Sequence, residues 1–131
     1  MRKVVADANV FLRFLLNDIP KQYLEAKQLF DLAKRKKIGI IVPQIIIFEV
    51  IFTMDKYYHF EKDHIIEGIN ALINTSFLEI QDRELFQQAL SIWKFQNISV
   101  ADCFLLARVE HDQVELFSFD KNLNSLANEQ K

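Results

Sequence analysis

Two short β-branched runs, each followed by a segment with helical periodicity, constrain the fold of this chain more than any other feature. Lys3–Ala6 predicts a buried strand, and Ile38–Pro43 predicts a second strand. Strands that alternate with helices form a mostly parallel sheet with helices on both faces. The expected class is therefore α/β, and in such sheets ligands bind beyond the carboxyl ends of the strands.

The rest of the chain continues this alternation. Two further strands are expected, at Ser76–Gln81 and Val114–Asp120, with a short helical turn after the second. Asn9, Asp82 and Ser99 are expected helix caps. The expected helices cover Val10–Leu16, Pro20–Lys37, the stretch that begins at Pro43 (PQIIIFEVIFTMDKYY), about Glu61–Asn74, Asp82–Phe95 and Ser99–His111.

Composition narrows both the architecture and the function. A length of 131 residues, half of them hydrophobic, predicts a single domain over residues 1–131 with a well-filled core. Gly39 and Gly68 are too few and too far apart for a glycine-rich phosphate loop, and Cys103 alone cannot form an internal disulfide. The three histidines lack zinc-ligand spacing. Every apolar run is broken before about 20 residues, so we expect a cytoplasmic protein with no membrane association.

The net charge constrains the function less strongly than the composition does. The formal net charge of −2 argues against a general nucleic-acid coat protein, which would be basic. One basic run, Lys34–Lys37, ends the second expected helix. Pairing with the helix C-terminal dipole explains this run, and contact with a nucleic acid is the alternative.

Four acidic residues do not fit a purely structural interpretation. Asp7 follows the first strand and Asp120 ends the last one, and capping of the next helix is the alternative for each. Asn9 could cap the first helix equally well, which leaves Asp7 partly unexplained. Asp102 lies three residues after Ser99 in a capping-box pattern.

Glu49 is the most unusual of the four. It lies inside the apolar run IIIFEVIF, so we expect it to have little access to bulk water. A buried, unpaired carboxylate is costly, and the structural alternative is a buried salt bridge with Arg13 or Arg108.

Taken together, the four carboxylates predict a metal site. Two end strands and two lie in early turns of helices that should begin near strand ends, so all four can meet at one rim of the sheet. Their mutual repulsion is relieved if divalent cations lie between them. Oxygen ligands favour Mg²⁺ or Mn²⁺, as one ion or two, and paired ions hydrolyse phosphodiesters by activating water and stabilising the leaving oxygen.

Four stretches carry a resemblance to a known family: VVADANVFLRFLL, VPQIIIFEVIF, ISVADCFLLARV and LFSFDKNL. In order and spacing they resemble the PIN-domain family, and in size the chain resembles the VapC-like toxin ribonucleases. The resemblance implies a three-layer α/β/α fold with a parallel sheet of four or five strands, and metal-dependent cleavage of RNA. It places Asp7, Glu49, Asp102 and Asp120 on the family's acidic positions, with Asn9 and Ser118 in supporting positions.

The leading hypothesis is an Mg²⁺/Mn²⁺-dependent endoribonuclease that acts as the toxin of a type II toxin–antitoxin pair of the VapBC kind. The resemblance also implies a homodimer and a cognate antitoxin protein. The alternatives are a non-catalytic module that binds RNA or protein, and an RNA-processing nuclease outside any toxin–antitoxin pair. An aspartyl phosphotransfer enzyme with Asp7 as nucleophile is disfavoured, because such enzymes carry Asp-x-Asp and Asn9 holds the second position.

Overall fold

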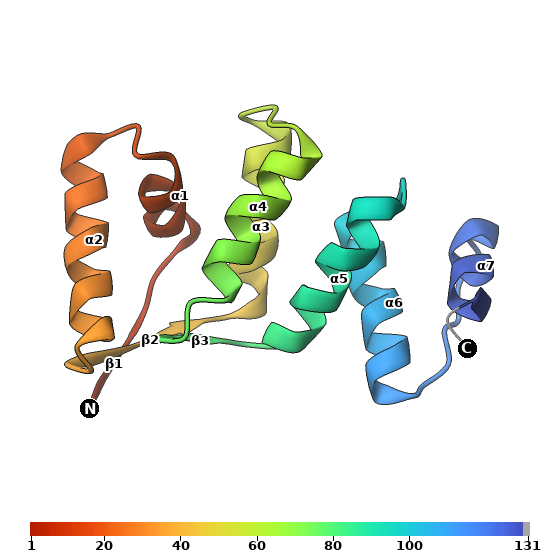
Figure 1. Cartoon of the computed structure of the whole chain (residues 1–131). Coiled ribbons are helices and arrows are strands. Elements are labelled where there is room, and N and C mark those ends of the chain that lie inside the picture. Colours follow the sequence, from red (N-terminus) through yellow and green to blue (C-terminus); the bar gives the residue numbers. More distant parts are fainter. Residues whose placement is uncertain (130–131) are drawn as a thin grey trace. The chain divides into compact units, whose positions relative to one another are not determined.

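The computed structural model describes residues 1–129. The chain divides into two compact units, and the boundary falls between Gln81 and Asp82. The first unit contains all three strands, and the second contains three helices (Figure 1). In the first unit the elements are β1 (Arg2–Val5), α1 (Ala8–Leu16), α2 (Pro20–Lys34), β2 (Ile38–Val42), α3 (Gln44–Lys56), α4 (Lys62–Ile73) and β3 (Leu78–Ile80). In the second unit they are α5 (Arg83–Phe95), α6 (Val100–Asp112) and α7 (Lys121–Glu129).

The sheet of the first unit is parallel, in the order β1-β2-β3. Lys3 is opposite Gly39, and Ile40 is opposite Leu78. Two successive crossovers in the same direction, both right-handed, place their helices on the same face of a sheet. In Figure 1, α1 to α4 accordingly lie to one side of the strands.

The helix-covered face of the sheet forms the core of this unit. Ile40 and Val42 of β2 are completely buried, and Phe11 and Phe30 stack with ring centroids 5.7 Å apart. The opposite face is open and polar at one end, where Lys3 Nζ bridges both oxygens of Glu79 at 2.8 and 2.7 Å. This bridge passes over Gly39, because a Cβ there would lie 2.7 Å from Glu79 Oε2.

The second unit is held together by the packing of its three helices. The rings of Phe86 and Phe104 lie 4.9 Å apart between α5 and α6. A smaller apolar cluster of Leu106, Leu123 and Ala127 joins α6 to α7.

The expected number of strands was wrong for the described residues. We expected four or five strands in three layers, and residues 1–129 contain three strands, with a two-layer arrangement in the first unit. Val114–Asp120 is not a strand. A strand needs a partner for its backbone N–H and C=O groups, and this segment instead makes local bonds, such as Asp120 N–H to Ser118 Oγ at 3.0 Å. The first strand was also expected to be buried, but Val5 is 63% exposed.

Most helix positions were predicted correctly, whereas two caps were not. Asp7, not Asn9, occupies the cap of α1. Asp82 precedes α5, but its left-handed backbone (φ 58°) leaves its side chain without a capping bond. The Ser99 cap is confirmed, since its hydroxyl accepts a hydrogen bond from Asp102 N–H at 3.1 Å. None of the helices within residues 1–129 is long and apolar enough to cross a bilayer.

Candidate active site

Asp7 lies in the turn that joins β1 to α1. Its Oδ1 accepts a hydrogen bond from Val10 N–H at 3.3 Å, so the carboxylate caps the helix. The residue is exposed, and within residues 1–129 it makes no ion pair. A carboxylate has about four acceptor positions, so most of the acceptor capacity of Asp7 remains available. Asn9 lies in the first turn of α1 and is also exposed.

Glu49 is not buried, although the sequence predicted that it would have little access to bulk water. It is exposed, because α3 buries only the stripe of Ile47, Val50, Ile51 and Met54. Glu49 lies on the other side of the helix with Ile45 and Phe52, which are 71% and 64% exposed. The expected alternative, a buried salt bridge, is absent from the described residues: Arg13 pairs with Asp18, and Arg108 pairs with Asp82 and Asp112.

Asp7 and Glu49 are brought to the same edge of the sheet by its topology. Asp7 is the second residue after β1, and Glu49 lies in the second turn of α3, which begins directly after β2. Because β1 and β2 are neighbouring parallel strands, their carboxyl ends meet at one edge. This is the edge at which open α/β sheets bind ligands.

Asp102 and Asp120 belong to the second unit, each at a helix N-terminus. Asp102 lies in the first turn of α6, where its backbone N–H is bound by Ser99. Asp120 immediately precedes α7, and its Oδ1 accepts a hydrogen bond from Leu123 N–H at 3.0 Å. Ser118 supports this turn: its hydroxyl accepts from Asp120 N–H, and its carbonyl accepts from the Asn124 amide at 2.9 Å.

The four acids are therefore divided between the two units, two in each. No group of three or more His, Cys, Asp or Glu side chains within residues 1–129 is arranged to hold a metal ion. The chemistry of the donors nevertheless fits a hard divalent cation, because all four side chains offer carboxylate oxygen. Capping occupies one oxygen of Asp7 and one of Asp120, which leaves their second oxygens available as ligands.

Comparison with known proteins identifies the family. A sequence model described as "PIN domain" matches residues 4–129. The chain belongs to the PIN domain family. A VapC ribonuclease of Aquifex aeolicus (strain VF5) is 21% identical to this PIN domain over 121 residues, which cover 92% of this chain and 89% of the relative.

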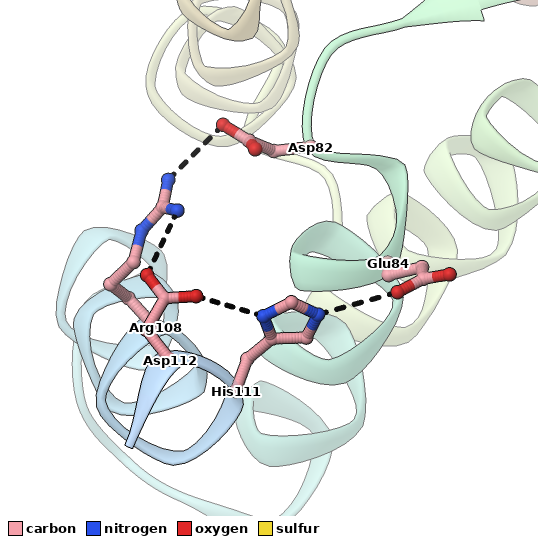
Figure 2. A network of polar contacts seen from close by, with 5 residues as sticks. All are labelled: Asp82, Glu84, Arg108, His111 and Asp112. Carbon is pink, nitrogen blue, oxygen red and sulfur yellow. Dashed lines mark hydrogen bonds and ion pairs between the residues drawn. The ribbon is translucent and has the colours of Figure 1, made fainter. Parts of the chain in front are cut away.

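The PIN domain also contains a polar cluster that the sequence did not predict. Figure 2 shows Arg108 and His111 of α6 among three carboxylates. Arg108 lies 3.1 Å from Asp82 and 3.2 Å from Asp112. The ring nitrogens of His111 lie 2.9 Å from Asp112 Oδ1 and 3.3 Å from Glu84 Oε2.

Two residues of this cluster, His111 and Asp112, have shifted pKa values. The hydrogen bond to Asp112, followed by that to Glu84, raises the pKa of His111 above 6.5. The same hydrogen bond from His111, assisted by Arg108, lowers the pKa of Asp112 below 3.8. Each partner therefore favours the charged form of the other. The cluster ties α5 to α6. The four-residue spacing of Arg108 and Asp112 within α6 is a signal that the sequence offers, whereas the contacts of α6 with Asp82 and Glu84 depend on tertiary structure.

Proposed function

We propose that this PIN domain is a metal-dependent endoribonuclease that hydrolyses RNA phosphodiester bonds. The observation that carries the proposal is the pair Asp7 and Glu49, two exposed carboxylates without an ion-pair partner within residues 1–129, at the carboxyl edge of a parallel sheet. Membership of the PIN domain family and the match to a VapC ribonuclease support it.

The proposed site contains Asp7, Glu49, Asp102 and Asp120, which would hold one or two Mg²⁺ or Mn²⁺ ions, and the two units would together make one nuclease domain. Bound divalent cations would supply activation of water and stabilisation of the leaving oxygen. Asp7 and Asp120 orient their carboxylates through their capping bonds to Val10 and Leu123. Asn9 and Ser118 support the two aspartates.

We further propose the role of a type II toxin in the cytoplasm, acting as a homodimer and neutralised by an antitoxin protein. The relative's designation as a VapC ribonuclease supports this finer assignment. An upstream reading frame for a small protein that binds this chain and blocks RNA cleavage would be the direct test.

The catalytic site is tested by Asp7→Asn and Asp102→Asn. Asn is as good a helix cap as Asp, so Asp7→Asn should change the free energy of unfolding by less than about 0.5 kcal/mol. We expect both variants to lose RNA cleavage by at least about a hundredfold, as found when one electrostatic group is removed from an active site. Asp31→Asn, at an exposed position of α2, is the matched control and should cleave normally.

Metal binding gives an independent measurement. Millimolar Mn²⁺ should raise the melting temperature of the wild-type protein, because a ligand that binds only the folded state stabilises it, and Asp7→Asn should reduce this shift. Folded, fully active variants at both Asp7 and Asp102 would refute the site. Wild-type protein that binds RNA without cleaving it would favour the non-catalytic alternative.

A further inference from the structure

A hollow lies at the opposite edge of the same sheet, between the end of α2 and the connection from α4 to β3. It has a volume of about 630 Å³, and its lining includes Lys34, Lys36, Gly39, Ser76 and Phe77. These residues precede or begin β2 and β3, whereas Asp7 and Glu49 follow β1 and β2. The hollow is therefore separate from the proposed catalytic residues.

Two of the residues that line this hollow, Lys34 and Lys36, are cations, and Lys37 and Arg2 lie next to its lining in the chain and in the sheet. Lys34, Lys36 and Lys37 are exposed and, within residues 1–129, have no carboxylate partner. Arg2 is also exposed, and the register of the sheet places it opposite Ile38, directly after Lys37. A carboxylate on the wall, Glu79, is neutralised by Lys3 at 2.7 Å. The hollow therefore carries excess positive charge in a chain whose net charge is −2.

Interaction with the C-terminal end of α2 explains only part of the basic run Lys34–Lys37. Arg35 closes α2, since its Nε and its backbone N–H both donate to the carbonyl of Asp31, at 3.4 and 3.0 Å. Lys36 follows with a left-handed backbone (φ 61°), a conformation that glycine adopts at lower cost at a helix end. Lys36 lines the hollow, and it bonds to the helix end through its backbone, whose N–H donates to the carbonyl of Ala33 at 3.0 Å.

We propose that this hollow binds phosphates of the RNA substrate at a distance from the bond that is cleaved. Lysine side chains bind phosphate oxygens as point charges, and contacts of this kind position a nucleic acid without reading its sequence. The hydroxyl of Ser76 adds a neutral donor at the rim. This inference rests on the proposed nuclease function and adds a requirement on the substrate.

The requirement is one of length. Arg2 lies opposite Ile38, which lines the hollow, and Asp7 comes five positions after Arg2. At about 3.3 Å for each extended residue, the two edges are therefore about 16 Å apart. A duplex RNA that contacts both edges must therefore extend several base pairs beyond the cleaved phosphate.

The test compares RNA binding by the wild-type protein and the double variant Lys34→Ala/Lys36→Gly. Glycine suits the left-handed backbone at position 36, so this substitution removes a charge without a folding defect. The probe is a 20-base-pair RNA hairpin, and its binding is measured by fluorescence anisotropy without divalent cations. Lys27→Ala, on the exposed surface of the same helix and outside the lining of the hollow, is the control for loss of charge.

We expect Kd for the hairpin to rise about five- to thirtyfold, from two lost charge contacts of ordinary surface strength. The slope of log K against log salt should become less steep by about 1.8, or about 0.9 for each contact. Lys27→Ala should change hairpin binding by less than twofold.

Each contrary result has a distinct meaning. A hairpin Kd that stays within twofold in the double variant would overturn this inference even if the wild-type protein cleaves RNA normally. A loss of hairpin binding in the double variant would support it even if the wild-type protein cleaves nothing, in which case the proposed nuclease function alone would fail. If 5 mM inorganic phosphate protects the wild type against heat and the double variant loses this protection while its hairpin binding is unchanged, the hollow is a site for small anions instead.

Discussion

Arg13 joins three segments of the first unit through one polar network, and its removal gives the sharpest test of how that unit is held together. Its Nη2 donates a 2.7 Å hydrogen bond to the hydroxyl of Tyr58, after the end of α3. Its Nε lies 3.4 Å from Asp18, in the connection between α1 and α2. The Arg13 side chain is only 13% exposed, whereas that of Asp18 is 37% exposed. Arg13 also lines a cleft of about 670 Å³ together with Asn9, so the network borders the surface beside Asp7.

The expected cost of Arg13→Met follows from these contacts. A hydrogen bond that involves a charged group contributes about 1.5–3 kcal/mol, and an ion pair with a partner as exposed as Asp18 adds at most about 1 kcal/mol. The substitution also removes the cost of burying Nε, which has no hydrogen-bond partner of good geometry. We therefore expect a loss of about 2 kcal/mol in the free energy of unfolding. Tyr58→Phe, which removes the acceptor, should cost about 1–2 kcal/mol.

Urea unfolding of the two single variants and the double variant measures the coupling between these residues. Because both single variants break the same 2.7 Å bond, the double variant should be more stable than the sum of the two losses predicts, by about 1 kcal/mol. Tyr57→Phe is the control, since Tyr57 is 74% exposed, and it should cost less than about 0.5 kcal/mol. A coupling below about 0.3 kcal/mol, the limit of ordinary additivity, would refute the assignment of Arg13 as the link between these segments.

Two further predictions concern the polar cluster and the open face of the sheet. The raised pKa of His111 stabilises the folded protein fully below the unfolded value of about 6.5, and this contribution is lost as the pH rises through the higher folded pKa. Wild-type stability, measured by urea midpoints between pH 6 and pH 8, should therefore fall with rising pH more steeply than that of His111→Gln; equal slopes would contradict the role of the cluster. Gly39→Ala should displace the Lys3–Glu79 bridge, since its Cβ would meet the ends of both side chains, yet it should cost less than about 1 kcal/mol because the pair is about half exposed. A larger loss in urea unfolding would show that the backbone at Gly39 has no room to adjust.

The sequence by itself determined the features that depend on near neighbours in the chain. The helices and the three strands lie close to their expected positions, because apolar periodicity, proline and β-branched runs act over a few residues. The Ser99 cap was predicted for the same reason: a capping bond spans only three residues. The spacing of four short stretches also indicated the PIN domain family, which the match over residues 4–129 confirmed.

Tertiary structure decided the environment of each residue. Glu49 was expected to be buried, but a helix with an apolar run buries only the stripe that meets its neighbours, and Glu49 lies outside that stripe. The alternating residues of Val114–Asp120 resemble a strand, yet a strand exists only where another backbone completes its hydrogen bonds. Asp82 lost its expected capping role because its backbone is left-handed and its carboxylate pairs with Arg108, 26 residues away. Local patterns therefore located the secondary structure and the acidic positions, whereas exposure, strand pairing and ion pairing depended on contacts between residues far apart in the chain.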